Sequence, residues 1–175
     1  MSDWHLDEVG LTKDIVLSHF QAETLLAARK QGRQRVFASF DLGLTQTEAL
    51  LNEIGIRILD GPLDTPCLSW RHVERIAESD NGCFLVEDGG VWRIKLFSET
   101  SNCLYSLMPT SAAPTMLVSG VPMHRIKGID PREDTLRKIA TLAPFSGSVL
   151  DTSTGLGYTA IEAARTADCV ITVEI

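Results

Sequence analysis

Apolar residues near the start of the chain follow the spacing of a helix. Between Thr12 and Gly32 they recur roughly every 3.6 residues, which predicts a helix that ends at the glycine. The residues on this stripe are Ile15, Val16, His19, Phe20, Leu25 and Leu26. A second, shorter helix is predicted over residues 46–54, because Thr45 and Glu48 match a capping box.

Between residues 35 and 122 the pattern favours strands. Runs rich in β-branched and aromatic residues predict strands at residues 35–44, 56–59, 102–109 and 115–121. Residues 83–97 predict a β-hairpin, because Asp-Gly-Gly separates two such runs. Ser69 is a suitable cap for a helix over residues 70–79. We therefore expect an N-terminal helical segment, residues 1–34, followed by a small α+β module with a mainly antiparallel sheet, residues 35–122.

The pattern changes after residue 122. Residues 128–144 predict a helix in which Asp130 is the N-cap, Pro131 takes the first helical position and Glu133 completes a capping box. A buried strand, 148–151, a helix, 157–167, and a further strand, 169–175, follow. Helix, strand, helix and strand in this order are typical of an α/β sheet. Residues 123–175 are thus expected to form the start of a Rossmann-like domain.

Composition narrows the class of protein. Of the 175 residues 44% are hydrophobic and 22% charged, the balance of a soluble globular chain. The net charge of −7 provides no general attraction for nucleic acid. One basic cluster, Arg29, Lys30, Arg33 and Arg35, fits either a solvated helix end or a contact with a small anion or RNA.

Neither secretion nor a metal site is indicated. The first ten residues lack the basic and apolar regions of a signal peptide, and no apolar run approaches the length of a membrane span. The four cysteines and four histidines have no metal-ligand or redox spacing. We expect a cytoplasmic protein with reduced cysteines, without a membrane or metal as partner.

A glycine-rich loop at residues 149–163, VLDTSTGLGYTAIEA, carries the strongest chemical signal. Glycine permits positive φ angles and lets a ligand approach the backbone closely. Gly155, Gly157 and Ala160 match the dinucleotide pattern G-x-G-x-x-A. Glu174 ends the next strand, where an acidic side chain can accept hydrogen bonds from ribose hydroxyls. An NAD(P)-dependent oxidoreductase is therefore one interpretation.

The residues before the glycines favour a different ligand. Asp151 ends the strand, and three small polar residues follow it, Thr152, Ser153 and Thr154. A carboxylate at this place repels a pyrophosphate but suits a ligand with a cationic amine and no phosphate. S-adenosylmethionine has an ammonium, a sulfonium and a free ribose diol, and so meets both requirements.

This segment, about residues 146–175, resembles motif I and the second-strand acid of class I, Rossmann-like S-adenosylmethionine-dependent methyltransferases. It departs from their pattern at Ser153, where the family often has its first glycine. The whole chain also looks like an uncharacterised, largely archaeal-type group of predicted methyltransferases, which are distantly similar to spermidine synthases. In that group an N-terminal β-rich module likewise precedes the Rossmann part.

The resemblance implies a role for each part of the loop. Asp151 would lie near the methionine ammonium, the backbone of Ser153, Gly155 and Gly157 would line the amino-acid and ribose portions, and Glu174 would take the ribose hydroxyls. The complete set of expected S-adenosylmethionine-binding residues is Asp151, Thr152, Ser153, Thr154, Gly155, Gly157, Tyr158 and Glu174. The segment around Met123 and His124 is expected beside this pocket, with His124 either a structural residue, a proton shuttle or a substrate contact.

The function expected from these signals is methyl transfer to an acceptor that is a small molecule, a protein or RNA. Aminopropyl transfer and a non-catalytic remnant are further alternatives, and self-association is left open. A doubly wound domain needs about 150 residues, and only its first β-α-β is present here. We therefore expect a fragment of a longer enzyme that holds half of the cofactor site, is inactive alone, and lacks the catalytic residues.

Overall fold

The computed structural model describes residues 14–59, 68–87 and 89–174. The chain forms two compact units, divided between Arg93 and Ile94. This division lies inside the 35–122 segment that the sequence predicted as one module, and the N-terminal helix belongs to the same core as the strands that follow it. Both units contain helices as well as sheets, and the sheets are mostly antiparallel, which confirms a mixed α/β chain.

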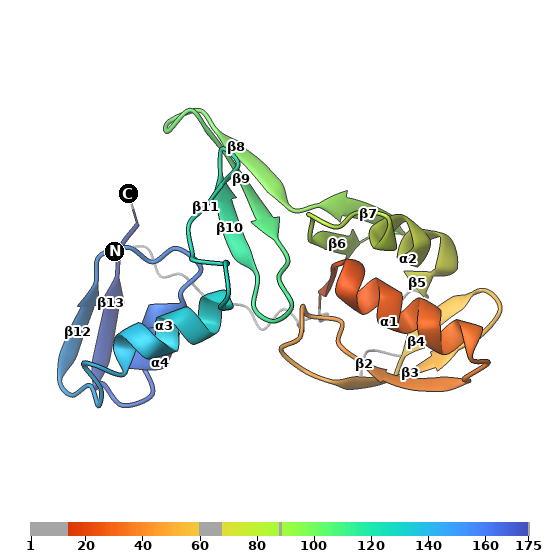
Figure 1. The fold of residues 1–175 in the computed structure, drawn as a ribbon, viewed down its shortest axis with the longest axis horizontal. Coiled ribbons are helices and arrows are strands. Elements are labelled where there is room, and N and C mark those ends of the chain that lie inside the picture. Colours follow the sequence, from red (N-terminus) through yellow and green to blue (C-terminus); the bar gives the residue numbers. More distant parts are fainter. Residues whose placement is uncertain (1–13, 60–67, 88, 175) are drawn as a thin grey trace, which may run out of the picture. The chain divides into compact units, whose positions relative to one another are not determined.

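The first unit combines two helices with two antiparallel sheets. Its elements are β1 (Ile15–Leu17), α1 (His19–Lys30), β2 (Arg35–Ala38), β3 (Thr47–Leu51), β4 (Gly55–Ile58), β5 (Leu68–Ser69), α2 (Trp70–Ala77), β6 (Phe84–Glu87) and β7 (Gly90–Arg93). One sheet has the order β2-β3-β4-β5, and the other β1-β6-β7. Helix α1 lies between the larger sheet and α2 (Figure 1), and all three contribute to one apolar core.

The first predicted helix begins later than expected. Residues 12 and 13 lie outside the described residues, and Ile15–Leu17 form strand β1, which pairs with β6. Ser18 then starts α1, because its backbone N–H and its hydroxyl both donate to Gln21 Oε1, at 3.0 and 2.6 Å. The alternating burial of Ile15 and Leu17 on either side of Val16 marks a strand rather than a helix turn.

The predicted helix at residues 46–54 is wrong. Residues Thr47–Leu51 form β3, with Thr47, Ala49 and Leu51 buried on one face. The strand pairs with β2 on one side and β4 on the other, so both of its edges are hydrogen-bonded. Thr45 does not cap a helix; its hydroxyl donates to Asp41 Oδ2 at 2.5 Å.

Two other predictions in this unit are confirmed. Ser69 accepts a hydrogen bond from His72 N at 3.3 Å and caps α2. β6 and β7 pair as the arms of a hairpin, but the predicted second arm is shorter than expected: residues 95–97 belong to strand β8 (Lys95–Ser98) of another sheet. In the basic cluster, Arg29 pairs with Glu74 at 3.1 Å and lies 4.5 Å above the Trp70 ring. Arg35 pairs with Glu48 at 3.0 Å. These pairs within the unit favour a structural role for the cluster.

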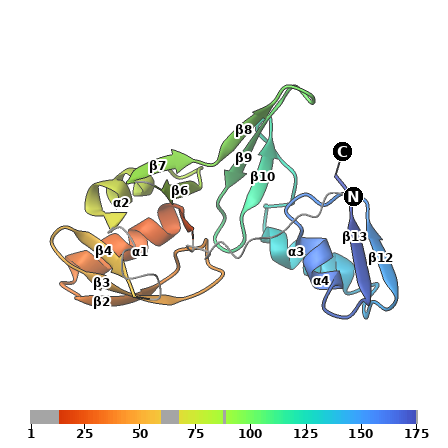
Figure 2. The ribbon, with the colours of Figure 1, turned by 180° about the vertical axis from the view of Figure 1, so that it is seen from behind.

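The second unit contains an antiparallel sheet and a small parallel one. Its elements are β8 (Lys95–Ser98), β9 (Cys103–Met108), β10 (Thr115–Val118), β11 (Val121–Pro122), α3 (Pro131–Ile139), β12 (Ser148–Asp151), α4 (Tyr158–Ala163) and β13 (Cys169–Thr172). The antiparallel sheet has the order β11-β10-β9-β8. Strands β12 and β13 lie beside α3 and α4 (Figure 2), and they pair in parallel from Ser148↔Cys169 to Asp151↔Thr172.

The predicted order of helix, strand, helix and strand is confirmed in this unit. Asp130 caps α3 by accepting from the N–H groups of Arg132 and Glu133, and Pro131 takes the first helical position. Strand β12 is not buried as expected: Leu150 is 63% exposed, and its partner Ile171 is 55% exposed. Helix α4 packs against both strands, and the opposite apolar face is uncovered within the described part of the chain.

None of the described helices combines the length and the apolarity that crossing a membrane requires.

Candidate functional site

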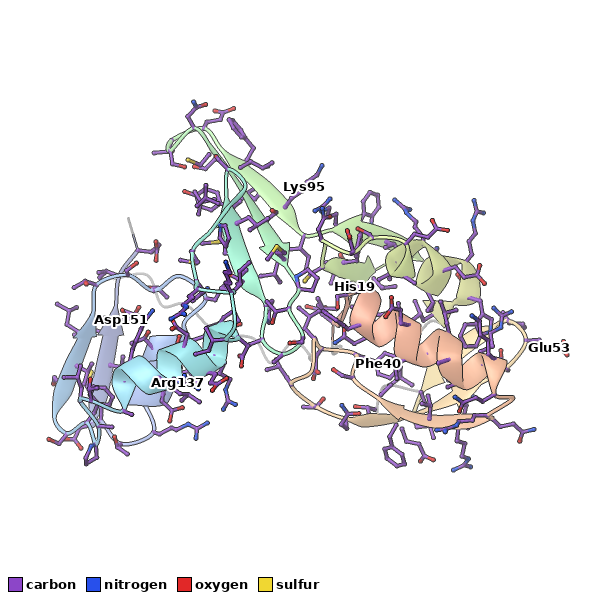
Figure 3. All side chains as sticks on the ribbon, in the orientation of Figure 1. His19, Phe40, Glu53, Lys95, Arg137 and Asp151 are labelled. Carbon is purple, nitrogen blue, oxygen red and sulfur yellow. The ribbon has the colours of Figure 1, made fainter. Side chains whose placement is uncertain are left out.

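The glycine-rich loop leaves the end of β12 and leads into α4. Asp151 closes β12 (Figure 3), and its carbonyl accepts a hydrogen bond from Val173 N at 2.9 Å. Thr154 N in turn donates to Val173 O at 3.0 Å. These two bonds hold the start of the loop against the residues that follow β13. The carboxyl ends of two parallel strands therefore meet at the loop.

The Asp151 carboxylate lies at this junction with one oxygen unpaired. Its Oδ1 accepts a hydrogen bond from Ser153 N at 3.3 Å. Its Oδ2 is buried and has no hydrogen-bond partner among the described residues. A buried acceptor without a donor costs about 1–3 kcal/mol, and more when it is charged. A positively charged donor brought to this oxygen by a ligand would remove this cost.

Glu174 brings a second carboxylate to the same loop. Gly155 N donates to Glu174 Oε2 at 2.7 Å, which fixes the acid across the first glycine. The two residues are nineteen positions apart in the chain. They meet because the parallel pairing of β12 and β13 places both strand ends at one edge. The loop thus has an acid on each side.

Both glycines have left-handed backbone conformations. Gly155 has φ +50° and Gly157 has φ +76°, a region that other residues adopt only with strain. Gly157 N donates to Thr154 O at 2.7 Å and closes the turn before α4 begins at Tyr158. The two glycines are needed for the turn itself, apart from any ligand.

Residues from the 121–131 segment lie beside the loop, as the sequence predicted for Met123 and His124. A Cβ built on Gly155 would come within 2.6 Å of Met123 Cε, so this side chain already covers the first glycine. The His124 ring lies 5.3 Å from the ring of Tyr158, the first residue of α4. Tyr158 Oη donates to Pro114 O at 2.8 Å. The loop is thereby tied to the antiparallel sheet of its own unit.

The predicted site residues have different environments in the structure. Hydrogen bonds join Asp151 to Ser153, and Gly155 to Glu174. The hydroxyls of Thr154 and Thr172 share a hydrogen bond, whereas Thr152 is exposed. Tyr158 donates its hydroxyl to Pro114 O, and its ring lies beside that of His124.

Sequence reasoning did not find Pro114 or Thr172 as partners of the loop. The Tyr158–Pro114 bond joins residues 44 positions apart, and no spacing rule connects them. Among the described residues, no three His, Cys, Asp or Glu side chains are grouped so as to hold a metal ion.

Replacement of Gly155 by alanine is expected to destabilise the second unit more than the same change at Gly157. Both substitutions place a side chain at positive φ, which costs about 1–2 kcal/mol. Only the Gly155 methyl would also meet Met123, because the nearest atom to a Gly157 Cβ is Ile161 Cδ1 at 3.7 Å. Urea denaturation followed by far-ultraviolet circular dichroism measures the two free energies of unfolding.

The Met123→Ala background is the control for this comparison. Removing the thioether takes away the contact but leaves the backbone strain, so the difference between the two glycine variants should then disappear. An unchanged difference would show that the Met123 contact has no part in it.

A curated protein of similar sequence provides a comparison for the chain. No model of a protein family matches the chain. The chain is similar to the protein MJ1233 of Methanocaldococcus jannaschii, which is described as uncharacterized, with 34% identity over 166 residues. The match covers 94% of this chain and 54% of the relative. The chain therefore spans about half the length of the curated relative that it matches.

Proposed function

We propose that the chain carries part of the S-adenosylmethionine site of a Rossmann-like methyltransferase. The observation that supports this most is the pair of acids at the Gly-x-Gly loop. Asp151 has a buried oxygen that no donor among the described residues reaches, and Glu174 is held across Gly155. Two carboxylates beside a glycine turn create a negative environment. Such an environment selects a cationic, hydroxyl-rich ligand over an anionic one.

Each acid suits a different part of the ligand. Asp151 Oδ2, which has no partner among the described residues, would accept a charge-assisted hydrogen bond from the α-ammonium of the ligand. Glu174 Oε2 accepts a hydrogen bond from Gly155 N, and the same carboxylate would also accept hydrogen bonds from the ribose hydroxyls. At Gly157 the ligand would approach the backbone without a Cβ in the way, whereas the Met123 side chain covers Gly155. When bound, S-adenosylmethionine supplies an electrophilic methyl group, and the residues of the loop bind and orient it.

The nicotinamide alternative has less support. A dinucleotide needs free backbone N–H groups at the glycine turn for its pyrophosphate. Here the Gly155 N–H donates to Glu174, and the Asp151 carboxylate lies at the start of the same loop. Both features oppose a phosphate at this position.

The exposed apolar face of β12 and β13 supports the Rossmann-like fold assignment. Leu150 and Ile171 form an apolar face of the parallel pair opposite α4. Parallel strands in α/β proteins are covered by helices on both faces, which is why they are apolar on both sides. The exposed face is therefore typical of a doubly wound sheet of which only one side is covered within the described residues.

Calorimetric titration with S-adenosylhomocysteine and, separately, with NAD tests the proposal. We expect saturable binding of S-adenosylhomocysteine and none of NAD. Glu174→Ala should weaken binding about 10- to 100-fold, because a hydrogen bond to a charged group contributes about 1.5–3 kcal/mol.

Glu162→Ala provides the matched control for Glu174→Ala. It removes the same charge from α4, where Glu162 pairs with Arg165 at 3.1 Å, and should change the affinity less than about threefold. Absence of S-adenosylhomocysteine binding would refute the proposal, and binding of NAD in its place would favour the oxidoreductase.

A further inference from the structure

Thr115, which is buried, and His124, which is half-buried, form a polar pair next to the glycine-rich loop. Thr115, the first residue of β10, is completely buried. Its Oγ1 lies 3.0 Å from His124 Nδ1, and His124 N donates to the same oxygen at 3.4 Å. The hydroxyl also donates to Met116 O at 3.4 Å. One threonine thus fixes both the backbone and the ring of His124.

One arrangement of the hydrogens in this network satisfies every group of Thr115 Oγ1 and defines one tautomer of His124. A hydroxyl group has one hydrogen to donate and two lone pairs. When its hydrogen is directed to Met116 O and one lone pair accepts from His124 N, the other lone pair of Thr115 Oγ1 accepts from Nδ1–H, 3.0 Å away. All three capacities are then used. In this arrangement the neutral ring carries its hydrogen on Nδ1 and leaves Nε2 unprotonated.

The surroundings of His124 keep the ring neutral near pH 7. Burial, and then the positive charge of Lys138, lower the pKa of His124 below its usual 6.5, while Asp134 opposes this change. Asp134 is itself paired with Lys138 at 2.5 Å. Arg125 lies close enough to help lower the pKa of Asp134. Tyr158 contributes an aromatic ring from α4.

His124 lies close to the proposed cofactor loop. Its ring is 5.3 Å from that of Tyr158, which directly follows Gly157. The preceding residue, Met123, lies against Gly155. In the described part of the chain, Nε2 forms no hydrogen bond. A neutral imidazole with a fixed tautomer, half-buried beside a ligand loop, has the properties of a general base.

We propose that His124 Nε2 accepts the proton of the methyl acceptor, a neutral nucleophile with an N–H or O–H group. This inference rests on the proposed function. As the acceptor atom bonds to the methyl carbon, the carbon–sulfur bond breaks with its electron pair going to sulfur. The acceptor's proton passes to Nε2, which gives an imidazolium. Thr115 is a positioning residue that keeps Nε2 unprotonated before this step.

Nitrogen-15 NMR of the histidine rings of the full chain tests the inference without an identified acceptor. We expect the His124 signals to show the Nδ1–H tautomer and to titrate below pH 6.5. Addition of S-adenosylhomocysteine should shift the Nε2 signal of His124. The signals of His72, which belongs to the other unit, should stay in place and serve as the internal control. Thr115→Val, which removes the hydroxyl, should increase the Nε2–H tautomer.

The outcomes separate this inference from the proposed function. If calorimetry shows that S-adenosylhomocysteine binds but the His124 signals do not respond, the inference is overturned and the function stands. An Nε2–H tautomer in the unmodified protein also overturns it. If S-adenosylhomocysteine does not bind at all, both fail. A shifted Nε2 signal together with the Nδ1–H tautomer supports both.

Discussion

Replacement of Asp151 by asparagine is expected to weaken S-adenosylhomocysteine binding about 10- to 100-fold without destabilising the ligand-free protein. The substitution removes the negative charge that would hold the ligand's ammonium. It keeps an acceptor for Ser153 N, which donates to Oδ1 at 3.3 Å. Because Oδ2 is buried with no partner in the described part of the chain, a neutral amide in its place costs less desolvation than the carboxylate. The free energy of unfolding should therefore stay the same or rise by about 1 kcal/mol.

These opposite effects distinguish a binding role from a structural one. Calorimetric titration measures the affinity, and urea denaturation of the ligand-free protein measures the stability. Asp168→Asn, which removes an equal charge just before β13, is the control for the general electrostatic effect. A loss of stability with unchanged affinity would assign Asp151 to holding the loop, and the cofactor proposal would lose its main support.

Replacement of Leu25 by alanine should lower the stability of the first unit by about 2–5 kcal/mol. Leu25 on α1 is completely buried in the core that joins α1 to the sheet and α2. Truncation leaves a cavity there, because the surrounding side chains relax only partly. Tryptophan fluorescence during denaturation follows this unit, since all three tryptophans precede Ile94.

Leu44→Ala is the matched control in the same unit. Leu44 is 85% exposed, so the same change of side chain should cost less than about 0.5 kcal/mol. Equal costs for the two variants would contradict the assignment of the core.

Several parts of the fold could be predicted because their signals are local. Asp130 with Pro131 determines the start of α3, and Ser69 determines that of α2, since a cap bonds to the N–H groups two or three residues later. The hairpin of β6 and β7 follows from a short turn between two strand-forming runs. The glycine-rich loop is equally local, because positive φ angles at Gly155 and Gly157 depend on the residue itself.

Strand β3 shows where local signals fail. Its residues favour a helix when considered alone, but pairing with β2 and β4 satisfies the backbone along both edges and buries Ala49 completely. This gain depends on partners that are distant in the sequence and exceeds a helix preference of a few tenths of a kcal/mol per residue. The exposed Leu150 likewise reflects which neighbours cover the strand, not its own apolar character.

The candidate site combines both kinds of information. The sequence by itself determined the loop, its glycines and the presence of acids at Asp151 and Glu174. Only the tertiary structure decided that Glu174 bonds to Gly155, that Asp151 Oδ2 has no donor among the described residues, and that His124 is fixed by Thr115. Capping and turn geometry act over a few residues. Hydrogen bonding and burial between distant segments depend on how the strands pair and the helices pack.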